Sequence, residues 1–174
     1  AKTAAALSEV YNTVLFRPED LFLIREGAAV RRRFMDNALC QLRPRYASAL
    51  SAYNRAQEQK IRILRDSEDR PALLDTLPEF NQQMIRYGAV LIHSRQQFVK
   101  RLNEYAAVHH WECSGGRERL TIGYQTVSSV KNPAAELPVL AGDLRRHMDS
   151  HQAAEQASRL CLSGPHKDDL LVEI

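Results

Sequence analysis

Two long stretches in which apolar residues recur every three or four positions constrain the fold more than any other feature of the sequence. The seam of the first, which begins at Pro44, is Tyr46, Leu50, Tyr53, Gln57, Ile61 and Leu64. The seam of the second, which begins near Thr76, is Phe80, Met84, Tyr87, Leu91, Phe98, Leu102 and Tyr105. This spacing predicts two helices that each carry one narrow apolar stripe.

The residues between the two seams predict how the helices are joined. Asp66 to Arg70, followed by Pro71, is typical of a short turn, and Thr76-Leu77-Pro78-Glu79 matches the capping box that starts a helix. Two long helices joined by a short turn form an antiparallel hairpin. At about 1.5 Å per residue the second helix would extend roughly 45 Å, so we expect the pair to form an arm.

Shorter elements precede the hairpin. Val14-Leu15-Phe16 is a β-type run that Pro18 ends, and a short turn or helix is expected from Leu21 to Ile24. Gly27 separates this segment from a helix predicted over 28–42. Pro44 then suits the first turn of the next helix, because its fixed φ matches the helical value.

The sequence after the hairpin mixes strand and helix signals. Ser114-Gly115-Gly116 predicts a hairpin-type turn, and Leu120, Ile122 and Tyr124 alternate as in a half-buried strand. A loop over 131–138 leads to a helix predicted over 139–158. One face of that helix carries Leu140, Leu144, Met148 and His151.

The last twelve residues combine a bend, a cluster of ionisable side chains and an apolar run. Gly164 and Pro165 force the bend, and we interpret 170–174 as a mostly buried strand of a covered sheet whose other strands lie outside this sequence. The expected fold is α+β and mainly α: a helical lobe with a long antiparallel helix pair, plus a few short strands of an incomplete sheet. Its expected parts are a strand and turn (1–27), a helical lobe and arm (28–111) and a strand-helix-strand segment (112–174).

Composition narrows the class of protein. The chain has 174 residues, 44% of them hydrophobic, which is enough for a core, and its net charge of +3 points only weakly to nucleic acid. Three cysteines, odd in number and far apart, disfavour a disulfide framework and favour a reducing, cytoplasmic location. No apolar run approaches the length of a membrane span, so we expect no membrane partner.

Arginines form the first candidate site. Arg31, Arg32 and Arg33 could form a phosphate-contacting stripe on a helix, since arginine binds phosphate with a forked pair of hydrogen bonds. Alternatively they are solvated, or pair internally with Glu26 and Asp36. Three consecutive helical residues fan over about 200°, so they cannot all face one ligand.

Histidines, cysteines and paired carboxylates form the other candidates. His109, His110 and Cys113, or His147 and His151 at i, i+4, could ligate a metal, or could be ordinary packing and surface residues. At the bend, Asp168 and Asp169 could hold a cation or a water. Equally, Asp168 could cap the turn while Asp169 pairs with Lys167 or an arginine.

The sequence contains no Gly-rich phosphate loop ending in Lys-Ser/Thr and no nucleophile elbow. We therefore expect no catalytic or cofactor-binding residue and no metal site in this chain, and no turnover by it. The alternative is a stand-alone helical protein-interaction module with an acidic metal-binding turn.

Four motifs occur in the order seen in the RecF family, which this chain resembles over nearly its whole length. They are Phe16-x-Pro18-Glu19-Asp20-Leu21, Arg32-Arg33-Phe34-Met35-Asp36, Tyr87-Gly88-Ala89 and Ser163-Gly164-Pro165-His166-Lys167-Asp168-Asp169-Leu170. The family's last motif resembles Gly-Pro-His-Arg-Asp-Asp, so Lys167 departs from it. Lysine keeps the charge but loses the fork of a guanidinium.

The resemblance implies a middle segment of an ATPase of the ABC and SMC type. It implies a parent protein that binds ATP and Mg²⁺, forms an ATP-dependent homodimer and binds single-stranded or gapped duplex DNA. RecO- and RecR-type partners, recombinase loading and a role in the SOS response are implied too. Within this chain the helix pair would be an SMC-like arm and the strands part of the ATPase sheet. Gly164, Pro165, His166, Lys167, Asp168 and Asp169 would form a turn close to the ATPase core, and Arg31–Arg33 would contact DNA or another lobe.

Overall fold

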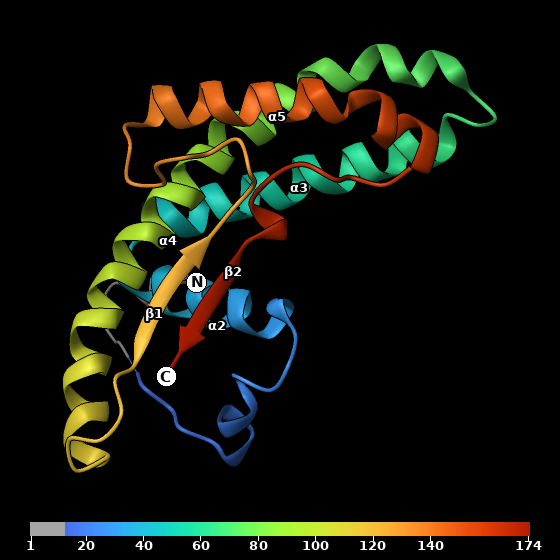
Figure 1. Ribbon diagram of the computed structural model, residues 1–174. Coiled ribbons are helices and arrows are strands. Elements are labelled where there is room, and N and C mark those ends of the chain that lie inside the picture. Colours follow the sequence, from blue (N-terminus) through green and yellow to red (C-terminus); the bar gives the residue numbers. More distant parts are fainter. Residues whose placement is uncertain (1–12) are drawn as a thin grey trace, which may run out of the picture. The chain divides into compact units, whose positions relative to one another are not determined.

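The computed structural model describes residues 13–174, which form a mainly helical α+β fold with one two-stranded sheet, as expected (Figure 1). The elements are η1 (Pro18–Phe22), α2 (Ala28–Leu42), α3 (Pro44–Asp66), η2 (Pro71–Thr76), α4 (Leu77–Cys113), β1 (Thr121–Gln125), α5 (Leu137–Ser158), η3 (Pro165–Lys167) and β2 (Asp169–Glu173). Within the described part of the chain, no helix is long and apolar enough to cross a membrane.

The chain divides into two compact units, each built from separated segments. Among the described residues, the first contains 13–47, 94–125 and 168–174, and the second contains 48–93 and 126–167. The boundaries fall inside α3 and α4, so each of these helices contributes to both units. The expected three-part division into 1–27, 28–111 and 112–174 stays a prediction.

In the first unit a short antiparallel sheet packs on helical residues. β1 pairs with β2 in antiparallel fashion (Figure 1). Ile122 lies opposite Val172, and Tyr124 lies opposite Leu170. Leu170 packs in a core with Met35 of α2 and Val99 of α4, where all three are at most 3% exposed. The half-buried strand predicted around Ile122 and Tyr124 is therefore confirmed.

The prediction of a mostly buried strand at the end of the chain is wrong for the structure observed. Only Leu170 of β2 is buried, whereas Leu171 is 40% and Ile174 is 77% exposed. The physical reason is that α2 and α4 cover one face of a two-stranded sheet, so a side chain on the other face, such as Leu171, stays exposed.

The hairpin elements begin and end close to where the sequence predicts. α2 covers 28–42 as expected, and α3 begins at Pro44. At the far end of the hairpin Ile63 and Leu64 of α3 pack against Leu77 of α4, in a core of the second unit. α4 is 37 residues long, which corresponds to roughly 55 Å.

The seam of α3 differs from the prediction at one informative position. Lys60 is fully buried while Ile61 is 41% exposed, so the stripe runs through Tyr53, Ala56 and Lys60. A lysine within an apolar stripe of three-four spacing is expected to be solvated. It can be buried only where a buried partner of opposite charge lies beside it. The long seam of α4 is buried at Met84 and Leu91.

Three further local predictions are wrong. Val14-Leu15-Phe16 forms no strand and is exposed, because no neighbouring strand lies against it in the described structure. Thr76 does not cap α4, since its hydroxyl donates to the carbonyl of Leu73 within η2. Ser114-Gly115-Gly116 closes the end of α4 rather than a β-hairpin, with the amide of Gly116 donating to the carbonyl of Trp111 at 2.8 Å.

α5 of the second unit confirms the helix predicted over 139–158 and extends it to Leu137. Leu140, Leu144 and Met148 are buried on one face, as the periodicity predicts. A side chain at Gly88 of α4 would meet Leu144 at 3.1 Å and Pro165 at 3.2 Å, so glycine allows the close approach of these segments. This accounts for the glycine of the Tyr87-Gly88-Ala89 motif.

Candidate functional site

The Ser163–Asp169 segment is divided between the two units. Residues 163–167 belong to the second unit, whereas Asp168 and Asp169 belong to the first.

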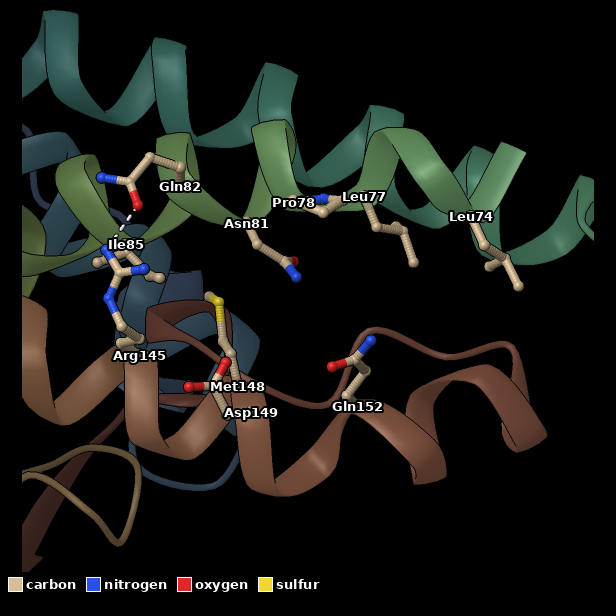
Figure 2. Close-up of a pocket in the computed structure, with 10 residues that line it drawn as sticks. All are labelled: Leu74, Leu77, Pro78, Asn81, Gln82, Ile85, Arg145, Met148, Asp149 and Gln152. Carbon is tan, nitrogen blue, oxygen red and sulfur yellow. Dashed lines mark hydrogen bonds between the residues drawn. The ribbon is translucent and has the colours of Figure 1, made fainter. Parts of the chain in front are cut away.

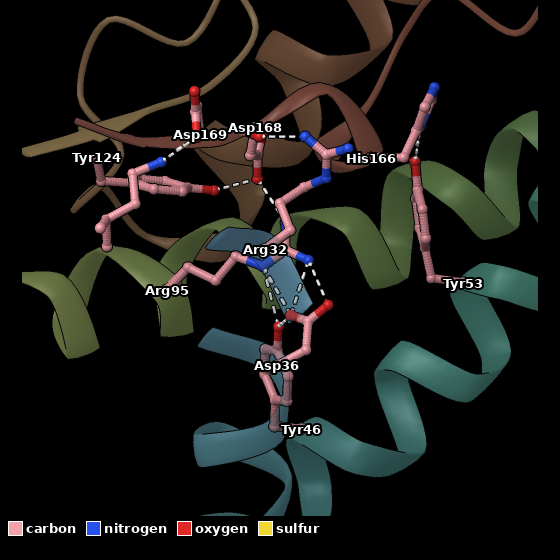
Figure 3. Close-up of polar contacts among 10 residues, drawn as sticks. Arg32, Asp36, Tyr46, Tyr53, Arg95, Tyr124, His166, Asp168 and Asp169 are labelled. Atoms are coloured by element: carbon pink, nitrogen blue, oxygen red, sulfur yellow. Dashed lines mark hydrogen bonds and ion pairs between the residues drawn. The ribbon is translucent and has the colours of Figure 1, made fainter. Parts of the chain in front are cut away.

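A buried arginine of α4 lies at the centre of the polar contacts in the first unit (Figure 3). The side chain of Arg95 is 3% exposed, and its Nη1 donates to Oδ2 of Asp168 at 2.7 Å. Its Nη2 donates to both carboxylate oxygens of Asp36, at 2.9 and 3.1 Å. Its Nε lies 3.0 Å from the hydroxyl of Tyr46. We call Arg95, Asp36, Tyr46, Tyr124 and Asp168 the Arg95 cluster.

Two tyrosines complete the Arg95 cluster. The hydroxyl of Tyr46 donates to Asp36 and that of Tyr124 donates to Asp168. Burial, followed by the effect of the Asp36 carboxylate, raises the pKa of Tyr46, although Arg95 acts in the opposite direction. Burial also opposes the charged form of Arg95, but the surrounding oxygens, including those of Asp168 and Asp36, outweigh it and raise its pKa. The arginine therefore remains a cation in the interior.

The three consecutive arginines of α2 have different surroundings. Arg31 makes a fork to Asp169, with Nε–Oδ1 at 2.7 Å and Nη2–Oδ2 at 2.9 Å. Arg32 donates to the main-chain oxygen of Asp168 at 2.7 Å. Arg33 is exposed. Arg31 and Arg32 thus hold the start of β2, and the internal partner of Arg31 is Asp169 rather than the carboxylate of Glu26 or Asp36.

The Arg31 fork affects the ionisation of both partners. Its hydrogen bonds lower the pKa of Asp169, helped by the amide of Leu170, and the same pair raises the pKa of Arg31. Asp169 therefore pairs with an arginine, one of the two alternatives left open by the sequence. Asp168 is fully buried and accepts from Arg95 and Tyr124.

In the second unit, His166 ties the bend to α3. Its Nδ1 lies 2.7 Å from the hydroxyl of Tyr53 and its Nε2 lies 3.1 Å from the carbonyl oxygen of Cys161. Since a carbonyl only accepts, Nε2 is the donor to the Cys161 carbonyl. Gly164 has φ of +130°, and a side chain there would collide with the Tyr53 hydroxyl. Lys167 is exposed.

A second buried ion pair holds the residues just before the bend. Lys60 Nζ lies 2.6 Å from Oε2 of Glu155, and the two side chains are 1% and 4% exposed. The other oxygen of Glu155 accepts from the amides of Leu162 and Ser163, at 2.7 and 3.1 Å. The Ser163 hydroxyl lies 2.9 Å from Nδ1 of His147. We call Lys60, Glu155, Ser163 and His147 the Lys60 cluster.

The histidines named as possible metal ligands lie in polar and stacking contacts, and Cys113 is a free, exposed cysteine. His147 stacks on His151 with ring centroids 4.1 Å apart, and burial, then the neighbouring His151, lower the pKa of His147. His109 lies 3.5 Å from Glu112, and His110 lies 3.1 Å from Glu118. Over residues 13–174, no group of three histidine, cysteine or acidic side chains is arranged to hold a metal ion.

Cys161 lies beside the Lys60 cluster but is unsuited to nucleophilic chemistry. The residue is 7% exposed, and burial raises the pKa of its thiol to about 11. A thiol must be a thiolate to attack, so this cysteine is inert at neutral pH.

One pocket of the second unit, between α4 and α5, has a volume of about 170 Å³. Figure 2 shows Leu77 and Met148 among its apolar lining and Arg145 bonded to the side-chain oxygen of Gln82, at 2.6 Å. Its lining carries no histidine, cysteine or serine and so offers no nucleophile with an adjacent base.

The sequence prediction missed the residues at the centre of both clusters. Arg95 occupies the turn left empty in the predicted seam between Leu91 and Phe98, and Lys60 stands one turn after Ala56. A charged residue in a gap of an apolar stripe is the available signal. It predicts a buried charge, but it does not identify the partner, which here comes from a distant part of the chain.

These contacts define a class of protein segment: a helical scaffold in which the charged motif residues hold a short sheet and a bend in place. The comparisons with known proteins identify it further. No model of a protein family matches the chain. It is 38% identical over 175 residues to the DNA replication and repair protein RecF of Agathobacter rectalis, covering 99% of this chain and 45% of that protein.

Other relatives and solved structures agree. RecF of Lachnoclostridium phytofermentans is 34% identical, with 97% of this chain and 44% of that protein covered. A structure of the recombination mediator protein RecF-ATPrS in the RecFOR pathway covers 99% of this chain and 46% of its own, with a TM-score of 0.91 at 23% identity, a likeness of fold. A structure of the recombination mediator protein RecF-ATP in the RecFOR pathway covers 94% of this chain and 43% of its own chain, with a TM-score of 0.86 at 25% identity.

The chain therefore matches a portion of the RecF proteins over nearly its whole length. It spans slightly less than half the length of the curated relatives that it matches.

Proposed function

We propose that this chain is the segment of a RecF-like recombinational repair protein that couples nucleotide-driven dimerisation to DNA and partner engagement. The observation that carries the proposal is the buried pair of Arg95 and Asp168, 2.7 Å apart, which ties α4 to the residue before β2. Because Arg31 and Arg32 hold the same strand start from α2, movement of the sheet would be passed directly to two helices of the first unit.

The wider properties of the parent protein are proposals as well. The parent protein would bind ATP and Mg²⁺, form an ATP-dependent homodimer and bind single-stranded or gapped duplex DNA. It would act with RecO- and RecR-type partners in the cytoplasm, where it helps to load recombinase in the SOS response. Similarity to structures described as RecF-ATP in the RecFOR pathway supports the nucleotide and the partners.

The residues of this chain do not themselves fit ATP or Mg²⁺. The sequence has no Gly-rich loop to cradle phosphates. The Asp169 carboxylate accepts from Arg31 through both oxygens, and Asp168 accepts from Arg95 and Tyr124. A cation would have to displace arginines from both acids. These acids act in the fold, and nucleotide chemistry would use residues elsewhere in the parent.

Of the three arginines predicted to contact DNA or another lobe, Arg33 is the one available for DNA. It is exposed and makes no side-chain hydrogen bond or ion pair within residues 13–174, whereas Arg31 and Arg32 are engaged with β2. We propose that Arg33 contacts a DNA phosphate and that its neighbours orient α2.

A binding assay with labelled gapped duplex DNA over a salt series tests this function. We expect the logarithm of the association constant to fall linearly with the logarithm of salt concentration, and Arg33→Gln to make the slope shallower by about one. Arg62→Gln, which removes another exposed arginine, is the matched control and should leave the slope unchanged. Absence of binding at low salt would refute DNA contact by this chain.

A further inference from the structure

The pocket between α4 and α5 has an apolar floor and a size that suits one small ring system. Leu77 and Ile85 of α4 and Met148 of α5, which are 4%, 3% and 2% exposed, form this floor. The pocket volume is about 170 Å³, whereas sites for drug-sized molecules measure about 300–1,000 Å³. An apolar cavity of about 150 Å³ holds a benzene molecule. The pocket therefore fits a compact aromatic molecule rather than a nucleotide or another large cofactor.

One polar atom of the pocket lining has no hydrogen-bond partner. The side-chain oxygen Oδ1 of Asn81 is buried and accepts no hydrogen bond from the residues that the structure describes. Figure 2 shows the Asn81 side chain pointing from α4 across the pocket towards α5. A buried acceptor without a donor costs free energy, so a ligand that supplies an N–H group there gains affinity.

The charges around the pocket favour a neutral ligand. Arg145 and Asp149, one helical turn apart on α5, are both exposed and opposite in sign. Arg145 also donates to the side-chain oxygen of Gln82, which joins α5 to α4 at one end of the pocket (Figure 2). The charged residues of the lining therefore offer no net attraction to an anion or to a cation.

We propose that this pocket binds a small neutral aromatic molecule with one N–H donor, the indole class, with the ring on the apolar floor and the N–H donating to Oδ1 of Asn81. An indole N–H only donates, which matches a lone acceptor. Such a ligand contacts both α4 and α5 and so stabilises their packing in the second unit. The inference goes beyond the proposed function and does not depend on DNA binding.

Methionine methyl groups report directly on this site, because the chain has three methionines and Met148 lines the pocket. We expect indole, titrated into the 174-residue chain labelled with carbon-13 at its methionine methyl groups, to shift the Met148 signal saturably in NMR spectra. Met35, a core residue of the first unit, should keep its signal unchanged. Met148→Leu identifies the Met148 signal by its loss.

N-methylindole, which has the same ring but no N–H, tests the role of Asn81. It should bind the parent about tenfold more weakly than indole, because the Asn81 oxygen then stays buried and unpaired. Asn81→Leu keeps the size of the side chain and removes the acceptor, so the two ligands should bind this variant equally. Asn54→Leu, at an exposed asparagine of α3 in the same unit, is the matched control and should keep the tenfold preference.

The stability of Asn81→Leu is the control for folding. Because the substitution removes a buried polar atom that has no partner, it should not lower the urea midpoint of the chain. The comparison of indole with N-methylindole on the parent chain needs no variant at all.

Results of two kinds would overturn the inference. If indole leaves the Met148 signal unchanged up to its solubility limit, or shifts Met35 equally, the pocket does not bind it selectively. If both ligands bind the parent equally, or if Asn81→Leu keeps the tenfold preference, Asn81 does not select the ligand. DNA binding, measured separately with gapped duplex, stands or fails independently of these results.

Discussion

Arg95 and Lys60 are both buried cations in gaps of an apolar helix stripe, yet the protein neutralises them in different ways. Arg95 spreads its charge over two carboxylates and a tyrosine, with three of its nitrogens engaged. Lys60 has one carboxylate, at 2.6 Å, and no well-aligned hydrogen bond among the described residues. Arginine can join several segments through its fork, whereas lysine acts as a point charge.

The Arg95 cluster should therefore be the more costly to disrupt. Arg95→Met leaves Asp36 and Asp168 without their cation in the interior, and we expect unfolding in urea to show a loss of about 3–5 kcal/mol. Arg95→Lys should lose less, because the charge remains while the fork is lost. A loss below about 1 kcal/mol for Arg95→Met would show that the cluster does not hold the first unit together.

Lys60→Met should cost less, about 1–3 kcal/mol, because the amides of Leu162 and Ser163 still hold the Glu155 carboxylate. Adding Glu155→Gln should recover part of this loss, since the buried charge is then removed as well. Denaturant unfolding of the two single variants and the double variant measures both effects. Equal losses for Lys60→Met and Arg95→Met would remove the distinction between the clusters.

The bend next to the Lys60 cluster gives a smaller and more local test. Gly164→Ala forces a side chain into a left-handed backbone conformation and against the hydroxyl of Tyr53. We expect a loss of about 1–3 kcal/mol, measured by thermal or urea unfolding. Combining it with Tyr53→Phe should relieve the collision. Full retention of stability in Gly164→Ala would mean that the bend is not fixed as described.

The smallest effect concerns pH. The pKa of His147 in the folded state is lowered by burial and by His151, so the unfolded chain binds more protons near its ordinary pKa of about 6.5. Stability should therefore be fully present above that pH and decline as pH falls through it towards the folded pKa. His147→Gln, which can still hydrogen-bond to Ser163, should flatten the decline. If the stability of the parent and of His147→Gln depended on pH in the same way, His147 would not be the titrating group.

The sequence predicts the helices better than the site, for a physical reason. Gly27 and Pro44 are local helix-boundary signals, and they correctly predict where α2 and α3 begin. Apolar spacing likewise identifies the buried face of α5. Strand burial could not be read from 170–174 in the same way, because it depends on what covers each face of the sheet.

The motif residues show the same limit. The sequence predicts Asp168 and Asp169 as acids of a charged turn, and the structure shows which cations hold them, Arg95 and Arg31. Arg95 lies 73 positions from Asp168, so no local rule connects the two. A charged residue within an apolar helix stripe indicates a buried ion pair at that position. Lys60 of α3 is a second example in the same chain.

The most direct test of the central claim, that the acids of the bend serve the fold, is a double-mutant cycle between Arg95 and Asp168. Urea unfolding of Arg95→Met, Asp168→Asn and the double variant gives their coupling free energy. We predict a coupling of about 2–3 kcal/mol, with the double variant losing far less than the sum of the single losses. Additive losses would contradict the claim and would return Asp168 to consideration as a ligand-binding or catalytic acid.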